Sequence, residues 1–340
     1  MERPDKALSA DTPCIMAGDI GGTKTYMGLF PFGSGRPDPV VTETFPSGSF
    51  DGIDGIIDAM LKKHQALIKA ACFGIAGPVI DGEATVTNLP WVVSEKRLQT
   101  RFGWHRVRLI NDLGATAMAI PLMAPAELEP LNAAPVRLKN NMALVAPGTG
   151  LGQAFLLCLD GRYVPLPSEG GHSDFAPTDE VEMNLWRHLR GRFGHVSVER
   201  LLSGQGIVNI YKGLKAIGGI AEVPETRQRM VDQDPARVIA DAAIDGDDPL
   251  SRETLERFCR ILGAVAGNLA LTGMTTGGVF LGGGIPPKIL PILKSSPFMD
   301  AFRDKGRFSE VMETIGVRVI VNDKAALVGA AAVGKSLLGL

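Results

Sequence analysis

Two glycine-rich turns, far apart in the chain, carry residue types that can bind phosphate. The first occupies residues 19–25 and the second residues 147–152, and each joins two apolar segments that we expect to be β-strands. Each turn places glycines beside a threonine, Thr23 or Thr149. Backbone N–H groups that no side chain shields can approach phosphate oxygens closely. Two such turns predict two related half-domains that close on one nucleoside triphosphate.

An aspartate that could act as a general base follows a predicted buried strand. The strand covers residues 107–110, so Asn111 and Asp112 lie at its carboxyl end. Open α/β sheets bind their ligands at this end of the strands. A carboxylate there can accept the proton of a substrate hydroxyl during phosphoryl transfer. Asp112 could equally cap the helix that follows, and its position alone does not choose between these roles.

A second polar group, later in the chain, fits a ligand with several hydroxyls. Glu169 and His172 flank two glycines, which disfavour the helix that a Glu-x-x-His metal pair needs. The resulting loop offers a hydrogen-bond acceptor and an imidazole that can donate or accept. Glu199 adds a carboxylate, although an isolated glutamate is most often a solvated helix residue. Farther on, a predicted strand over 279–281 runs into a triple-glycine turn, which could hold a flat ring or could be only a tight turn.

One motif is a decoy. Residues 329–336 match the P-loop pattern G-x-x-x-x-G-K-[ST], which needs a flexible loop followed by a helix. The intervening residues are strong helix formers, and only residues 337–340 follow. We therefore predict an ordinary helix here. Residues 148–153 likewise fail as a dinucleotide fingerprint, because Gln153 occupies the third glycine position and a strand follows.

Composition narrows the class of protein. The chain has 340 residues, 45% of them hydrophobic, and a net charge of -2, which does not favour nucleic acid or anionic lipid as a partner. The four cysteines form no closely spaced pair, so we expect reduced thiols, a cytoplasmic location and no zinc. The charge-free stretch between Arg260 and Lys288 is interrupted by glycines, which predicts a buried helix and strand and no membrane span.

The order of the predicted elements indicates an α/β protein with two related lobes. We predict a small lobe over 14–121 plus 323–340, a large lobe over 122–322 and a flexible tail over 1–13. Strands are predicted over 15–17, 26–30, 40–45, 71–75, 107–110, 142–146, 154–159, 279–281 and 317–321, and helices over 54–69, 115–122 and 324–338, with further helices that start after Asp234 and Asp248.

Together these motifs resemble the bacterial glucokinases of the hexokinase–actin–Hsp70 ATPase superfamily. The resemblance covers nearly the whole chain, from Gly18 to the final helix. The matching segments are, in order, 18–23, 87–91, 110–112, 148–152, 169–172 with Glu199, and 281–284. The resemblance implies a two-lobed actin-like ATPase (ribonuclease H-like) fold with a ligand cleft between the lobes. It also implies transfer of a phosphoryl group from ATP to the 6-hydroxyl of D-glucose, and a homodimer.

The resemblance further implies residue roles. Asp112 would be the general base, and Asp19 would orient Mg²⁺ through water. The sequence lacks the cysteine-rich zinc motif of the related repressor/open-reading-frame/kinase (ROK) group, which indicates the zinc-free branch. The sugar would contact Asn88, Asn111, Asp112, Glu169, His172 and Glu199, and the nucleotide Gly18, Asp19, Ile20, Gly21, Gly22, Thr23, Gly148, Thr149, Gly150, Gly282 and Gly283.

The sequence is also compatible with two other functions. A sugar-sensing regulator could use the same fold without catalysis, although it would need no phosphate turns. A kinase could act on fructose or an N-acetylated hexosamine, because such sugars differ in few hydrogen-bonding groups. The phosphoryl donor is also not determined by the sequence.

Overall fold

The computed structural model describes residues 11–33, 35–246 and 248–339, and these form two compact units. Unit 1 runs to Ala124 and resumes at Asn322, and unit 2 is Pro125–Val321. Most of the predicted tail, residues 1–10, lies outside the described residues, and Pro13 already belongs to the first strand.

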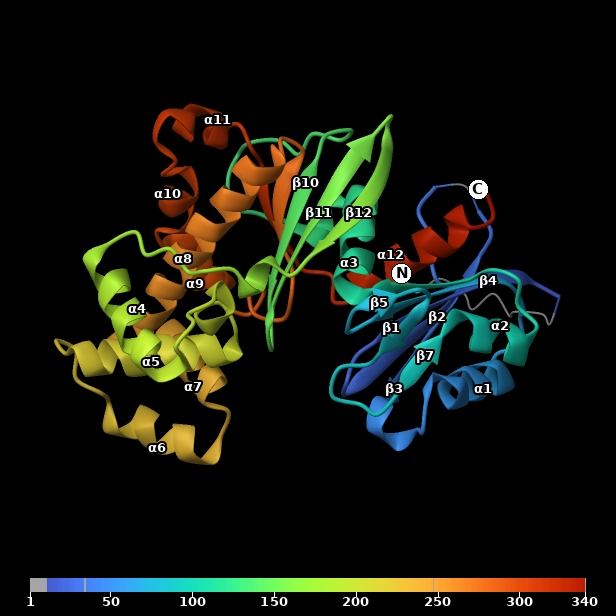
Figure 1. Cartoon of the computed structure of the whole chain (residues 1–340), viewed down its shortest axis with the longest axis horizontal. Coiled ribbons are helices and arrows are strands. Elements are labelled where there is room, and N and C mark those ends of the chain that lie inside the picture. Colours follow the sequence, from blue (N-terminus) through green and yellow to red (C-terminus); the bar gives the residue numbers. More distant parts are fainter. Residues whose placement is uncertain (1–10, 34, 247, 340) are drawn as a thin grey trace. The chain divides into compact units, whose positions relative to one another are not determined.

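Unit 1 is built on a five-stranded sheet in the order β3-β2-β1-β4-β8 (Figure 1). β1, β2 and β3 pair antiparallel, whereas β4 and β8 run parallel to β1. The carboxyl ends of β1, β4 and β8 therefore share one edge of the sheet. The strands are β1 (Pro13–Ile20), β2 (Lys24–Pro31), β3 (Val41–Pro46), β4 (Leu67–Ile75) and β8 (Val107–Asn111), with a small separate sheet of β5 (Val79–Ile80), β6 (Glu83–Thr85) and β7 (Val92–Ser94).

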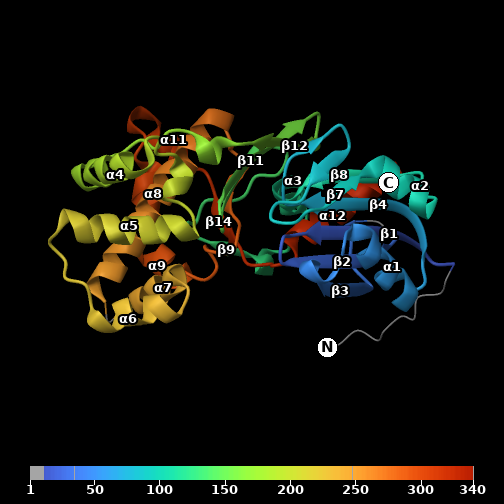
Figure 2. The ribbon, with the colours of Figure 1, turned by 60° about the horizontal axis from the view of Figure 1, so that its bottom comes forward.

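Apolar side chains project from both faces of this sheet, because successive residues of a strand point to opposite faces. Cys14 and Met16 of β1 enter one buried cluster with α1, and Ile15 and Ala17 enter another with α12. The ribbon in Figure 2 shows α12 and α1 on opposite sides of these strands. Helices cover both faces of the sheet, which is typical of α/β proteins. The helices of unit 1 are α1 (Ile53–Lys63), α2 (Glu95–Phe102), α3 (Asp112–Ala119) and α12 (Ala325–Ser336), with short 3-10 turns η1 (Ser47–Ser49) and η2 (Ile120–Leu122).

Unit 2 repeats the topology of unit 1. Its sheet has the order β12-β11-β10-β13-β14-β9, in which β10 pairs antiparallel with β11 and parallel with β13. The first five strands match β3-β2-β1-β4-β8 in order and direction, and β9 adds an antiparallel edge. The prediction of two related halves is confirmed at this level. The strands are β9 (Leu128–Pro130), β10 (Met142–Pro147), β11 (Leu151–Leu159), β12 (Arg162–Ser168), β13 (Gly278–Leu281) and β14 (Val317–Ile320).

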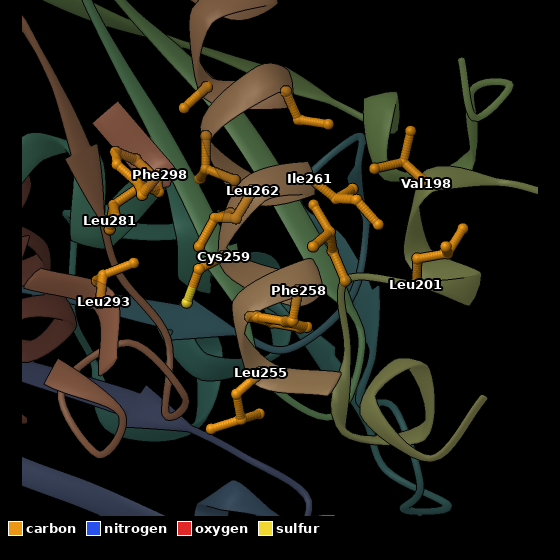
Figure 3. Close-up of a cluster of buried hydrophobic side chains, with 14 of the residues drawn as sticks. Val198, Leu201, Leu255, Phe258, Cys259, Ile261, Leu262, Leu281, Leu293 and Phe298 are labelled. Atoms are coloured by element: carbon orange, nitrogen blue, oxygen red, sulfur yellow. The ribbon is translucent and has the colours of Figure 1, made fainter. Parts of the chain in front are cut away.

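The core of unit 2 is organised around the long helix α8 (Pro249–Gly273). Its buried residues Leu255, Phe258 and Leu262 pack with Leu281 of β13 and Phe298 of α10 (Figure 3). None of the helices in the described residues has the length and apolarity that a membrane crossing requires. The other helices are α4 (Glu180–Phe193), α5 (Gly204–Ile217), α6 (Pro224–Asp232), α7 (Pro235–Asp245), α9 (Leu290–Ser295), α10 (Phe298–Arg303) and α11 (Ser309–Glu313), with 3-10 turns η3 (Pro125–Glu127), η4 (Gly170–His172), η5 (Val198–Arg200) and η6 (Gly306–Phe308).

Local sequence signals for helix starts are confirmed. Asp234 accepts a hydrogen bond from the N–H of Ala236, and Asp248 accepts from those of Leu250 and Ser251, so both aspartates cap a helix that begins with proline. The decoy residues 329–336 lie inside α12, as predicted.

The helix predicted over 54–69 is wrong in its second part. α1 ends at Lys63, and β4 begins at Leu67. Leu67 and Ile68 pair with Pro13 and Cys14 of β1 in the sheet. This long-range pairing overrides the local preference for helix, which the sequence alone does not reveal.

Close packing of α12 on α3 gives a stability prediction. A Cβ atom at Gly329 of α12 would lie 1.7 Å from the carbonyl oxygen of Ala115 in α3. We expect Gly329→Ala to lower the free energy of unfolding by about 3 kcal/mol, measured by urea denaturation, because neither helix backbone can yield cheaply. Gly114→Ala in α3 is the control, since no atom lies within 4 Å of its Cβ, and it should change stability by less than about 1 kcal/mol. Equal stability of the two variants would contradict this account.

Candidate functional site

The carboxyl edge of the unit 1 sheet brings two aspartates together. Asp19 lies near the end of β1, and Asp112 begins α3 directly after β8. Gly74 of β4 pairs with Asp19 on one side and with Ile110 on the other. A Cβ at Gly74 would lie 3.1 Å from Cβ of Ala115 in α3, which is tighter than an ordinary contact, and 3.5 Å from Asp112 Cα. Glycine at position 74 therefore lets the first turn of α3 pack closely on β4. Gly74 is not among the predicted site residues, although a glycine inside a buried strand signals such a close approach.

Burial raises the pKa of both carboxyl groups, and the charge of Asp112 further disfavours ionisation of Asp19. Burial, together with the negative charge of Asp112, raises the pKa of Asp19 to about 7. Burial also raises the pKa of Asp112, although the N–H of Leu113 partly opposes this by donating to Oδ1 at 2.8 Å. Among the described residues, no positively charged side chain lowers the pKa of either aspartate. The pair is therefore suited to hold a proton or to attract a cation.

Asn111 fills the capping role that the sequence left open for Asp112. Its Oδ1 accepts hydrogen bonds from the N–H groups of Leu113 (3.0 Å) and Gly114 (3.3 Å). Its Nδ2 donates to the carbonyl oxygen of Gly77 at 3.1 Å. The side chain of Asn111 thus fixes the start of α3, and with it the position of Asp112.

The first glycine-rich turn lies beside these aspartates, at the link between β1 and β2. The N–H of Gly21 donates to the carbonyl oxygen of Lys24 at 3.1 Å and closes the turn. A Cβ at Gly22 would lie 2.9 Å from the carbonyl oxygen of Thr87 and 3.4 Å from Cβ of Asn88, so the turn contacts the segment that carries Asn88. Thr23 and Asn88 are exposed.

Two predicted nucleotide residues of this turn have a packing role. Ile20 is fully buried in the core. A Cβ at Gly18 would lie 2.7 Å from the ring of Phe73 and 2.9 Å from the sulfur of Met27. Glycine at position 18 is therefore explained by close packing inside the sheet.

In unit 2, the second glycine-rich turn and the triple-glycine turn meet at the carboxyl ends of β10 and β13. The N–H of Ile285 donates to the carbonyl oxygen of Pro147 at 3.2 Å, and that of Gly282 to Val145 at 2.9 Å. Gly283 has a φ of +78°, and a Cβ there would lie 2.4 Å from the carbonyl oxygen of Pro147. Only glycine combines this conformation with so close a contact. The structure thus brings Gly148, Thr149 and Gly150 next to Gly282 and Gly283.

The predicted sugar residues of unit 2 form one polar group beside the same turn. Glu199 Oε2 accepts a hydrogen bond from the N–H of Leu151 at 2.9 Å. His172 Nδ1 lies 4.0 Å from Glu199 Oε1, and His172 Nε2 lies 3.9 Å from Glu169 Oε2. A Cβ at Gly150 would lie 2.6 Å from Glu199 Oε2, so this glycine admits the carboxylate. Glu199 is therefore no isolated surface residue, and its side chain joins the turn to the His172 group.

Comparison with known proteins identifies the family. The family model described as Glucokinase matches residues 16–337. The chain belongs to the glucokinase family. The glucokinase of Nostoc punctiforme is 38% identical over 332 residues, covering 93% of this chain and 97% of that protein. The glucokinase of Citrobacter koseri is 36% identical over 328 residues, covering 96% and 99%.

Solved structures agree with this assignment. The crystal structure of a glucokinase from an Antarctic psychrotroph has a TM-score of 0.84 and 31% identity, covering 95% of this chain and 99% of that one. A ROK-family glucokinase from Streptomyces griseus, solved with glucose and AMPPNP, has a TM-score of 0.59 at 22% identity, covering 95% and 99%, and shows the fold alone. The predicted actin-like ATPase fold is confirmed. So is the predicted enzyme class, since the family's enzymes phosphorylate glucose with ATP.

The raised pKa of Asp19 predicts a pH dependence of stability. Between about pH 4 and 7 the folded state holds a proton on Asp19 that the unfolded state releases, so stability falls as the pH rises through this window. We expect the free energy of unfolding of the wild type to fall relative to that of Asp19→Asn from pH 4 to pH 7, measured by urea denaturation. In an Asp112→Asn background the fall should end at a lower pH, because one cause of the shift is absent. Parallel pH profiles for wild type and Asp19→Asn would contradict this assignment.

Proposed function

We propose that this chain transfers the γ-phosphoryl group of MgATP to the 6-hydroxyl of D-glucose, giving glucose 6-phosphate and ADP, with Asp112 as general base. The observation that carries the proposal is the pair Asp19 and Asp112 at the carboxyl edge of the unit 1 sheet, beside a glycine-rich turn. In this proposal Asp112 accepts the proton of the sugar hydroxyl, and Asp19 interacts with the cation that is bound to the phosphates.

Asp112 accepts the proton of the 6-hydroxyl. The oxygen of this hydroxyl attacks the γ-phosphorus, and ADP departs as the leaving group. A carboxylate with a raised pKa accepts a proton more readily than an exposed one, which suits a general base. The Asn111 cap and the bond from Leu113 N–H to Asp112 Oδ1 limit its rotation. Little of the binding energy is then needed to orient the base.

Asp19 fits a magnesium ion that arrives with the nucleotide. Mg²⁺ prefers oxygen ligands and commonly uses one or two carboxylates with substrate phosphates and water. Within the described residues, no group of three or more His, Cys, Asp or Glu could hold a metal by itself. A cation near Asp19 would offset the two effects, burial and the charge of Asp112, that disfavour its negative charge. Bound Mg²⁺ would neutralise charge on the transferring phosphoryl group.

Unit 2 supplies the remaining contacts in this proposal. Glu169, His172 and Glu199 hold the other sugar hydroxyls, since their polar atoms form one array. Gly148, Thr149 and Gly150 hold phosphate oxygens, and the turn at Gly282 and Gly283 lies against the adenine. AMPPNP is an ATP analogue, so the ligands of the Streptomyces griseus structure support this pair of substrates. The family resemblance also supports a cytoplasmic homodimer that acts in glycolysis.

A substrate panel tests the proposed activity. Glucose, mannose, fructose and N-acetylglucosamine are each assayed with ATP, ADP or polyphosphate in the presence of Mg²⁺. We expect kcat/KM to be highest for glucose with ATP. A higher value for another sugar or donor would reject the assignment, and no product at saturating concentrations would favour a sugar sensor.

The role of Asp112 predicts a specific loss of turnover. Asp112→Asn should lower kcat by ~10²–10⁴, while the dissociation constant for glucose stays within a few-fold, because amide and carboxylate have similar shapes. The matched control is Asp81→Asn, an exposed aspartate of the same unit with a φ of +51° that asparagine also adopts. This control should keep wild-type kcat. Near-normal turnover in Asp112→Asn would remove Asp112 from the mechanism.

A further inference from the structure

Ser47 is a fully buried serine that contacts the first glycine-rich turn at three points. It begins η1, directly after β3. Its Oγ donates a hydrogen bond to the carbonyl oxygen of Gly21 at 2.8 Å and lies 3.0 Å from Oγ1 of Thr25. Its N–H donates to the carbonyl oxygen of Thr23 at 3.0 Å. A residue more than twenty positions away in sequence thus holds both sides of the turn.

The direction of these bonds follows from counting protons. A hydroxyl has one hydrogen, and that of Ser47 is donated to the Gly21 carbonyl. Thr25, which is also fully buried, must therefore donate to Ser47 Oγ. The result is a continuous chain from the Thr25 hydroxyl through the Ser47 hydroxyl to the Gly21 carbonyl. Such chains strengthen each member in a buried environment.

These bonds decide which backbone groups the turn presents. In a trans peptide the C=O of one residue and the N–H of the next point in opposite directions. Because the Gly21 carbonyl points at Ser47, the Gly22 N–H points away from it. In the described part of the chain, the N–H groups of Gly22 and Thr23 donate to no backbone oxygen of a turn, loop or cap. Ser47 therefore donates hydrogen bonds to the carbonyl oxygens of Gly21 and Thr23, and the N–H groups of Gly22 and Thr23 stay available to a ligand.

We propose that Ser47 is a positioning residue for the nucleotide, which orients the Gly21–Gly22 peptide so that its N–H faces the phosphates of MgATP. This inference rests on the proposed function, because it assigns the turn at residues 21–23 to the nucleotide. A carbonyl oxygen in the same place would repel a phosphate oxygen. Glycine on both sides of the peptide bond makes rotation of this peptide easy, so an anchor outside the turn is needed.

The test compares binding of the two substrates in Ser47→Ala. The dissociation constants of MgATP and glucose are each measured by titration calorimetry, with the melting temperature as a control for folding. We expect MgATP to bind about tenfold more weakly, as one lost buried hydrogen bond implies, and glucose to bind within twofold of wild type. A general loss of structure would weaken both ligands.

Three further variants sharpen the comparison. Ser251→Ala removes another fully buried serine, whose Oγ has no hydrogen-bond partner, and should leave the affinity for MgATP unchanged. Thr25→Val removes the hydrogen bond between Thr25 and Ser47 but keeps the bond from Ser47 to the Gly21 carbonyl. It should therefore weaken MgATP binding less than Ser47→Ala does. Ser47→Cys keeps the size with a weaker donor, and it replaces Ser47→Ala in the comparison if that variant does not fold.

The outcomes separate this inference from the proposed function. Wild-type affinity for MgATP in Ser47→Ala, or equal weakening of both ligands, would overturn the role of Ser47 and leave the proposed function standing. If the wild type bound no MgATP, the proposed function would fail, and the inference with it. A selective loss of MgATP affinity that Ser251→Ala does not share would establish Ser47 as a positioning residue.

Discussion

The chemistry that we propose for unit 1 depends on placing the carboxyl groups of Asp19 and Asp112 near each other at a buried sheet edge. Separating such charges from water disfavours their ionised forms, which is why burial heads the causes of both raised pKa values. Both aspartates lie at this edge because the parallel strands β1, β4 and β8 end together there, and Gly74 on the middle strand leaves room for Ala115 of α3. Burial of the two carboxyl groups costs free energy, and the apolar clusters on both faces of the sheet offset this cost.

The two units share one feature at the carboxyl edge of the sheet, which is a glycine-rich hairpin turn held in place by residues outside it. Each has an antiparallel hairpin next to a parallel strand, and each turn is fixed by groups from elsewhere in its unit. In unit 1 this group is Ser47, which contacts Gly21 and Thr25, and in unit 2 the turn contacts Gly283 and Glu199. A turn held from outside can keep its N–H groups oriented before the ligand arrives, which lowers the ordering cost of binding.

The division of labour between side chains follows from their hydrogen-bonding capacity. Asn111 has a donor and an acceptor, so it can cap α3 and bind the Gly77 carbonyl at once. Asp112 has only acceptors when ionised, and one of them is used by the adjacent Leu113 N–H. Neighbours in the sequence therefore take different parts, one in holding the helix and one in the chemistry we propose.

The sequence by itself determined the α/β class, the repeated hairpins, the caps at Asp234 and Asp248, and the helix over the P-loop decoy, because these depend on local composition and short-range bonds. It also determined the family, through the order of its motifs. Only the tertiary structure decided that β4 begins at Leu67, that Gly18 and Ile20 are packed in the core, that Gly74 lies against α3, and that Ser47 bonds to the first glycine-rich turn. These features arise from contacts between residues distant in the chain. Among them only Gly74 carries a local signal, as a glycine inside an apolar strand, because periodicity and local preference do not encode long-range contacts.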